Sequence, residues 1–223
     1  MIEAHGLTDP GRKRKHNEDT LRIEPAIGLA VVADGMGGHQ SGEVASALAV
    51  ETLEAFVARA HRDRDLTWPF GVDPARSFEA NCLITAIKLA NRSVFQTAAS
   101  RDDLTGMGTT VVAVLARDGR LHYAGVGDSR AYLVRGATLR QLTRDDSWIE
   151  AAIAQQLIDV AESYDHPFRH VLTKALGLQE DLDFEVSEEA LQAGDRVLLC
   201  SDGLTTALSD ADVLEILRAH DKD

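Results

Sequence analysis

The chain has 223 residues, of which 44% are hydrophobic and 26% are charged, proportions typical of a folded globular domain. Aspartate and glutamate number 36 against 23 lysine and arginine residues, so the formal net charge is −13. A surface this acidic repels a phosphate backbone, and we therefore expect no nucleic-acid partner. A surplus of carboxylates usually only solvates the surface, and the spacing of the acidic residues has to decide whether some of them bind divalent cations instead.

The two cysteines, Cys82 and Cys200, lie far apart in apolar surroundings. This indicates buried free thiols rather than a disulfide framework or a zinc site. No apolar run approaches the roughly 18 residues of a membrane span, and the N-terminus does not read as a secretory signal. We therefore expect a cytoplasmic protein without membrane contact and, since no oligomer signal is present, a monomer.

In chain order, the first half of the sequence alternates between strand and helix patterns. Residues 20–23 read as a short strand, and the apolar run 28–33 reads as a buried strand that stops at Asp34. Apolar residues at helical spacing then predict amphipathic helices over 42–60 and over about 77–98, with a loop between them.

The second half opens with period-two patterning. It predicts a hairpin of 109–115 with 121–126, and another of 131–134 with 138–142. Further elements are helix-like patterning over 147–176, a buried strand over 195–200 and an amphipathic helix over 210–219. Helices interleaved with antiparallel hairpins indicate an α+β layered domain.

Acidic residues follow the ends of several predicted strands. The arrangement occurs at Asp34-Gly35, Gly127-Asp128 and Asp202-Gly203, and Glu18 and Asp19 form another acidic pair. A single Asp-Gly is a common turn, but several carboxylates gathered at one end of a sheet would repel each other without a counter-cation. All-oxygen ligands suit Mg²⁺ or Mn²⁺, and a pair of such ions can activate water for attack on a phosphoryl group. The pattern favours metal-assisted phosphate hydrolysis.

A dense basic cluster, residues 12–15, precedes the Glu18-Asp19 pair. A basic run is more often a solvated loop, and most of this one fits that description. At least one of its side chains is nevertheless placed to bind a substrate phosphate, which the planar fork of an arginine does better than a lysine.

Motifs spread over residues 9–204 together resemble the type 2C metal-dependent serine/threonine protein phosphatases (PPM family), in their compact bacterial form. They are Asp9-x-Gly11-x-x-Arg14-x-x-Asn17-Glu18-Asp19, Asp34-Gly35-Met36-Gly37-Gly38-His39, Gly108-Thr109-Thr110, Gly127-Asp128-Ser129-Arg130-x-Tyr132, Leu142-Thr143-x-Asp145 and Cys200-Ser201-Asp202-Gly203-Leu204. The resemblance implies a four-layer α-β-β-α sandwich of two antiparallel sheets flanked by helices. It also implies one domain over residues 1–223 with a flap-like insertion at about 147–176.

The resemblance implies two central Mn²⁺ or Mg²⁺ ions and a third, weaker one. Asp34 would bridge the central ions, Gly35 would offer its carbonyl to them, and Glu18 would hold one ion through water. Asp202 would bind the other central ion. Asp128 and Asp202 would together form the third site.

The implied reaction is hydrolysis of phosphoserine and phosphothreonine in proteins by a hydroxide that bridges the two ions, with Arg14 binding the phosphate. Phosphorylated proteins would be the substrates, and a Ser/Thr kinase would act on the same proteins in signalling. Some members carry a histidine, as a candidate general acid, where this chain has Met36. His39 lies nearby and is a candidate for that role, although a purely structural histidine in the glycine turn fits equally well.

Two departures from the family pattern stand out. Asp146 occupies the position where the Leu-Thr-x-Asp motif usually continues with histidine. The final Asp-Asn-x-Thr segment, whose aspartate binds the first metal in the family, has no counterpart in the 223 residues. Either the sequence is truncated or it lacks that ligand, which leaves a catalytically attenuated, phosphoprotein-binding or regulatory module as the alternative. The intact acidic set at Glu18, Asp34, Asp128 and Asp202 favours the enzyme.

Overall fold

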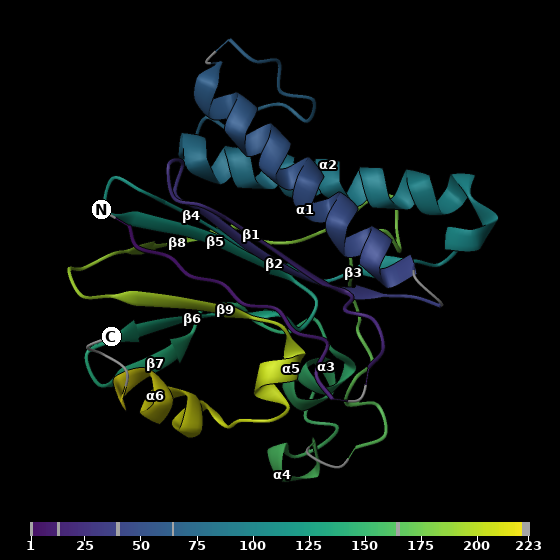
Figure 1. Ribbon diagram of the computed structural model, residues 1–223, viewed down its shortest axis with the longest axis vertical. Coiled ribbons are helices and arrows are strands. Elements are labelled where there is room, and N and C mark those ends of the chain that lie inside the picture. The colour runs from purple at the N-terminus through teal and green to yellow at the C-terminus, as the bar shows by residue number, and fades with distance from the viewer. Residues whose placement is uncertain (1, 13, 39–40, 64, 164–165, 220–223) are drawn as a thin grey trace.

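The structure is a computed structural model that describes residues 2–12, 14–38, 41–63, 65–163 and 166–219. Its elements stack as two long helices, a six-stranded sheet, a three-stranded sheet and a short C-terminal helix (Figure 1). Every strand pairing in both sheets is antiparallel. The predicted α+β sandwich of two antiparallel sheets flanked by helices is therefore confirmed.

The larger sheet has the strand order β1-β2-β4-β5-β8, with β3 paired to β2. Its strands are β1 (Asp19–Glu24), β2 (Leu29–Met36), β3 (Gly108–Thr109), β4 (Val111–Arg117), β5 (Arg120–Val126) and β8 (Ser187–Ala190). Buried and half-buried residues alternate along β2, as expected of a strand with two different faces. Leu29, Val31 and Ala33 face the core under the helices.

Two helices, α1 (Ser41–Arg62) and α2 (Phe78–Ser100), pack against each other and cover one face of this sheet (Figure 1). Ser77 caps α2, because its side chain accepts a hydrogen bond from the backbone N–H of Ala80. Leu53 and Val57 of α1 and Ile87 of α2 are fully buried in the same core. This layer is the main hydrophobic core of the domain.

The smaller sheet has the order β7-β6-β9, formed by β6 (Arg130–Arg135), β7 (Thr138–Gln141) and β9 (Arg196–Cys200), with α6 (Asp210–Ala219) outside it (Figure 1). The layer between the two sheets is less filled than the helical one. Residues of β1 and β9 are mostly only half-buried. A cavity of about 890 Å³ lies between these two strands and the N-terminal residues 2–8.

The remaining elements are the 3₁₀ turn η1 (Asp102–Leu104) and three short helices, α3 (Trp148–Ala154), α4 (Val160–Ser163) and α5 (Asp202–Thr205). Residues 147–176 were expected to be helix-like with a break at His166-Pro167, but of the described residues there only α3 and α4 are helical. None of the described helices combines the length and apolar character needed to cross a membrane. Both cysteines are free and buried, as predicted, and burial raises the pKa of Cys82 to about 12 and that of Cys200 to about 11.

Candidate metal and active site

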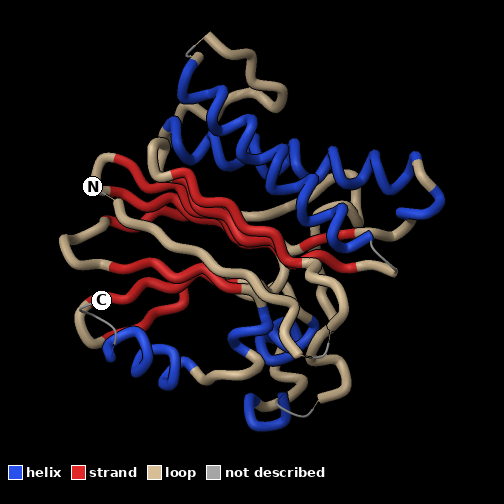
Figure 2. Tube along the Cα trace, viewed as in Figure 1, coloured by secondary structure: helices blue, strands red, loops and turns tan. Residues whose placement is uncertain are grey.

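The strand register brings acidic residues from both sheets to one edge of the sandwich. In the β1–β2 ladder Asp19 lies opposite Asp34. In the β6–β9 ladder the first residue of β6 pairs with the last residue of β9, so the turn that carries Asp128 and the start of α5 at Asp202 lie beside each other. Figure 2 shows loops and short helices gathered at this end of the strands. The predicted convergence of Asp34, Asp128 and Asp202 at one end of the sheets is therefore present.

Asp34 has the most perturbed carboxyl group at this edge. Burial, followed by the charges of Asp19 and Asp202, raises the pKa of Asp34 from 3.8 to about 8. A hydrogen bond between the side chains of Asp34 and Asp19 raises it further, because it favours the protonated acid, while Arg14 acts in the opposite direction. Asp34 is thus a buried acid surrounded by like charge.

Asp128 is perturbed by the same neighbourhood. Burial, followed by the charges of Asp202 and Asp145, raises the pKa of Asp128 to about 6. The charge of Asp202 therefore raises the pKa of both Asp34 and Asp128, although these two residues lie in different connections of the chain. Ser201, just before Asp202, donates a hydrogen bond of 2.9 Å to Oδ2 of Asp19, which ties the end of β9 to the start of β1.

Close packing of backbone holds Glu18 and Gly35 next to each other. The backbone oxygen of Glu18 accepts hydrogen bonds from the N–H of Gly35 (3.0 Å) and the hydroxyl of Ser46 (2.6 Å). A Cβ on Gly35 would lie 2.0 Å from the backbone oxygen of Gly42, and one on Gly42 would lie 2.6 Å from Oε1 of Glu18. Both glycines are needed for α1 to begin this close to the end of β2. Glu18 therefore reaches the same edge as Asp34.

Arg14 places a cation beside these acids. Its Nη1 lies 3.4 Å from Oε2 of Glu18, and its charge lowers the pKa of Asp34. The Arg14 side chain is 59% exposed, so it is free to turn toward a bound anion. Lys13 and His39 lie outside the described residues.

The donor chemistry of this edge fits a hard divalent cation. The side chains are carboxylates and Gly35 adds a backbone carbonyl. Burial, followed by repulsion between the carboxylates, raises the pKa of Asp34 and Asp128, and a bound cation would relieve that repulsion. Within the described ranges, no three histidine, cysteine, aspartate or glutamate side chains are clustered closely enough to hold an ion as they stand.

Comparison with known proteins identifies the family. The model of the family described as "Protein phosphatase 2C" matches residues 12–220. The chain belongs to the protein phosphatase 2C family. It is 35% identical to a serine/threonine phosphatase, stp, from Listeria innocua over 225 residues, which cover 98% of this chain and 84% of that protein. It is 37% identical to the serine/threonine protein phosphatase PstP from Mycobacterium tuberculosis, covering 98% of this chain and 39% of PstP.

Solved structures of bacterial phosphatases share the fold. The crystal structure of Mycobacterium tuberculosis PstP has a TM-score of 0.81 at 35% identity, with 96% of this chain and 84% of that chain covered. The catalytic domain of PstP in complex with two manganese ions has a TM-score of 0.77 at 34% identity, with 95% and 82% covered. The chain is accordingly a serine/threonine phosphatase of the 2C family, with two antiparallel sheets in the family's arrangement.

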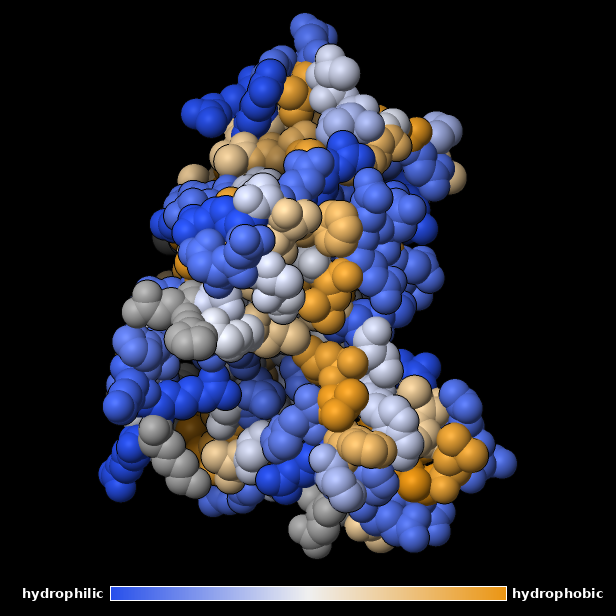
Figure 3. Space-filling model, turned by 90° about the vertical axis from the view of Figure 1, so that its right-hand side faces the viewer, coloured by the Kyte–Doolittle hydropathy of each residue, from blue (hydrophilic) through white to orange (hydrophobic). Residues whose placement is uncertain are grey.

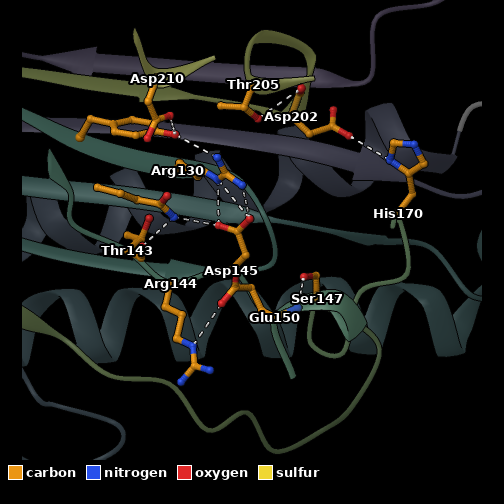
Figure 4. Close-up of polar contacts among 12 residues, drawn as sticks. Arg130, Thr143, Arg144, Asp145, Ser147, Glu150, His170, Asp202, Thr205 and Asp210 are labelled. Carbon is orange, nitrogen blue, oxygen red and sulfur yellow. Dashed lines mark hydrogen bonds and ion pairs between the residues drawn. The ribbon is translucent and has the colours of Figure 1, made fainter. Parts of the chain in front are cut away.

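In this phosphatase, the described residues 147–163 and 166–176 lie beside the acidic edge. The backbone N–H of Trp148 donates to the carbonyl of Val171 (2.8 Å), and the Trp148 ring stacks on His166 with centroids 4.7 Å apart. This pairing carries His170 to the site, where its Nδ1 lies 3.9 Å from Oδ2 of Asp202 (Figure 4). Figure 3 views the side of the molecule that carries this segment and shows hydrophobic side chains among hydrophilic ones. The exposed large hydrophobic residues of the segment are Leu157, Val160, Phe168 and Val171.

A buried ion pair supports the turn that carries Asp128. The guanidinium of Arg130 donates to both oxygens of Asp145, with Nη2 2.7 Å from Oδ2, and its Nη1 donates to the hydroxyl of Tyr132 (Figure 4). Tyr132 in turn donates to Asp210 at the start of α6 (3.1 Å). The Asp145 side chain is only 8% exposed, so this fork is strongly shielded from water.

The sequence motifs include several of these residues but do not predict which contacts they make. Asp19 was part of an acidic pair, and its place opposite Asp34 follows only from the strand register. Asp145 and Arg130 were motif residues, but nothing in their spacing showed that they bind each other. His170 comes to Asp202 through long-range contacts such as the hydrogen bond from Trp148 to Val171, and no local pattern signals that contact.

Proposed function

We propose that this phosphatase hydrolyses phosphoserine and phosphothreonine in proteins at the acidic edge formed by Asp34, Asp128 and Asp202. The observation that carries the proposal is the strand register, which sets Asp19 opposite Asp34 and, through the pairing of Arg130 with Cys200, brings the turn of Asp128 beside the start of α5 at Asp202. Burial and the charges of Asp19 and Asp202 raise the pKa of Asp34 in keeping with this geometry. An acid in such surroundings binds a proton or a cation at neutral pH. A pair of Mn²⁺ or Mg²⁺ ions, when bound, would supply a hydroxide placed for direct attack on phosphorus.

In this proposal each acidic residue has its own role in metal binding. Asp34 would hold both ions, Asp202 would hold one of them, Glu18 would hold the other through water, and Gly35 would offer its carbonyl. Asp128 and Asp202 together provide a third, weaker site. The charge of Asp202 contributes to the raised pKa of both Asp34 and Asp128, and its closeness to both residues supports these roles.

Arg14 binds the substrate phosphate. Its guanidinium can offer two parallel N–H donors to phosphate oxygens, and its exposure leaves it accessible to a substrate. As charge develops on those oxygens, a fixed guanidinium stabilises it. His39 stays the proposed proton donor to the leaving hydroxyl, with a structural role as the alternative.

The substrates are phosphorylated proteins, and we propose that a Ser/Thr kinase acts on the same proteins in signalling in a bacterial cytoplasm. The domain acts as a monomer, and residues 147–176 serve as the flap that contacts the substrate beside Asp202. The alternative is an attenuated domain that binds phosphoproteins without turning them over.

The experiment is a phosphatase assay on p-nitrophenyl phosphate and on a phosphothreonine peptide, with Mn²⁺, with Mg²⁺ and with chelator. We expect hydrolysis that depends on the added ion and is lost in Asp34→Asn. Peptide binding without turnover, in a chain that binds Mn²⁺, would favour the alternative. Turnover that is indifferent to chelator would contradict the metal-dependent reaction.

A further inference from the structure

A pair of buried hydroxyl groups lies between the strand that carries Asp34 and the turn that carries Asp128. Oγ1 of Thr110 and Oγ of Ser129 are 2.8 Å apart. Both residues are only 2% exposed, so neither hydroxyl is available to bulk water. We call this contact the hydroxyl bridge.

On the Asp34 side, the hydroxyl of Thr110 takes the place of one backbone acceptor of the sheet ladder. In a hydrogen-bonded pair of an antiparallel ladder, the two opposed residues exchange two backbone hydrogen bonds. Thr110 gives one of them, from its N–H to the carbonyl of Asp34 (2.9 Å). The N–H of Asp34 instead donates to Oγ1 of Thr110 (2.9 Å), at the point where β3 ends and β4 has not yet begun. The Asp34 backbone is therefore held by a side chain that also contacts Ser129.

On the Asp128 side, the same threonine fixes the turn. Gly127 has a φ of +98°, and a Cβ there would lie 2.7 Å from Cγ2 of Thr110. The turn is closed from its other side by the N–H of Asp146, which donates to the carbonyl of Gly127 (2.7 Å). Asp128 therefore lies between Gly127, which packs against Thr110, and Ser129, whose hydroxyl is hydrogen-bonded to that of Thr110.

We propose that Thr110 is a positioning residue whose hydroxyl, through Ser129, sets the placement of the Asp34 carboxylate relative to that of Asp128 for divalent-cation binding. The proposal rests on the metal-dependent function proposed above. The two carboxylates reach the site from different connections, and Oγ1 of Thr110 contacts both, since it accepts from the N–H of Asp34 (2.9 Å) and lies 2.8 Å from Oγ of Ser129. Outer groups that orient metal ligands typically change metal affinity by about 10- to 100-fold when they are removed.

The test measures Mn²⁺ affinity by calorimetry and by the electron paramagnetic resonance signal of free Mn²⁺, neither of which depends on turnover. Thr110→Val keeps the shape and removes the hydroxyl, and we expect its Mn²⁺ dissociation constant to rise about 10-fold or more. Thr110→Ser restores the hydroxyl and should bind close to the unaltered chain. Ser129→Ala breaks only the bridge, leaves the Asp34 N–H bond in place, and should weaken binding by less than Thr110→Val.

Thr85→Val is the matched control, because Thr85 is another threonine with 1% exposure but lies in α2, away from the acidic edge. It should lose a similar hydroxyl without any change in Mn²⁺ affinity. Thermal unfolding in chelator checks that each variant is folded, and Ser129→Ala decides the question should Thr110→Val fail to fold.

The measurements distinguish a failure of the proposed function from a failure of the proposed role of Thr110. An unaltered chain that does not bind Mn²⁺ overturns the proposed function, and this inference with it. An unaltered chain that binds Mn²⁺, with equal affinity in the folded bridge variants, overturns this inference alone. A loss in Thr110→Val that Thr110→Ser does not restore would assign the effect to packing, which also contradicts it.

Discussion

Asp34→Asn should stabilise the protein when divalent ions are removed. The carboxyl of Asp34 has a pKa of about 8 in the folded chain against an ordinary value of 3.8. The folded state therefore keeps a proton that the unfolded state releases, so the stability of the metal-free protein falls as pH rises from about 4 to about 8. Asparagine has no charge to bury, and its amide can still donate to Asp19 as the protonated acid does.

The size of the effect follows from the shift. A difference of about four pKa units corresponds to at most about 5 kcal/mol of lost stability at pH 8. Partial exposure and movement of the neighbouring acids reduce this, so we expect Asp34→Asn to gain about 2 kcal/mol at pH 8, or about 4–8 °C in Tm for a domain of this size. Near pH 4 the Asp34→Asn protein and the unaltered protein should have the same Tm.

The assay is thermal unfolding with chelator at a series of pH values between 4 and 8. Asp181→Asn, which removes a carboxylate from an exposed position, is the control and should show no such pH-dependent gain. A difference between Asp34→Asn and the unaltered chain that stays constant with pH, or an Asp34→Asn protein that is less stable at pH 8, would refute the argument from buried like charge.

Three further predictions concern neighbouring residues. Arg14→Ala should raise KM more than it lowers kcat in steady-state kinetics, because its exposed guanidinium binds substrate phosphate; an unchanged KM would contradict that role. Gly35→Ala should lose Mn²⁺ binding in calorimetry, since its Cβ would lie 2.0 Å from the Gly42 oxygen, and normal binding would show that α1 can move away. Asp145→Ala should lower the free energy of unfolding in urea by about 2 kcal/mol, because it leaves the half-buried guanidinium of Arg130 without its counter-ion, whereas a loss below about 1 kcal/mol would mean that water replaces the carboxylate.

Much of the fold was predictable because its strands and helices carry clear periodicity. The apolar run before Asp34 predicted β2, but β2 continues to Met36, because β3 pairs with Gly35 and Met36. β8 was missed, since Ser187–Ala190 contains two glutamates and no apolar alternation; pairing with β5 makes it a strand. Between residues 147 and 176, helix-like spacing produced only short helices in the described part of the chain, because contacts such as that of Trp148 with His166 override local preference.

The candidate site was predictable to the extent that its residues follow strands. An aspartate at the end of an apolar run is visible in the sequence, and so Asp34, Asp128 and Asp202 could be grouped. Contacts set by register or by long-range packing were not visible. The hydrogen bond of Ser201 to Asp19 and the hydroxyl bridge of Thr110 with Ser129 join residues far apart in the sequence, which no local spacing encodes.

The most direct test of the central claim is the Mn²⁺ dependence of phosphothreonine-peptide hydrolysis in the unaltered chain and in Asp34→Asn, measured alongside Mn²⁺ binding. The claim is that buried like charge around Asp34 makes this edge a cation site for phosphate hydrolysis. It predicts that binding and turnover appear together with Mn²⁺ and are lost together in Asp34→Asn. Turnover that survives in Asp34→Asn, or Mn²⁺ binding that the substitution leaves unchanged, would contradict it.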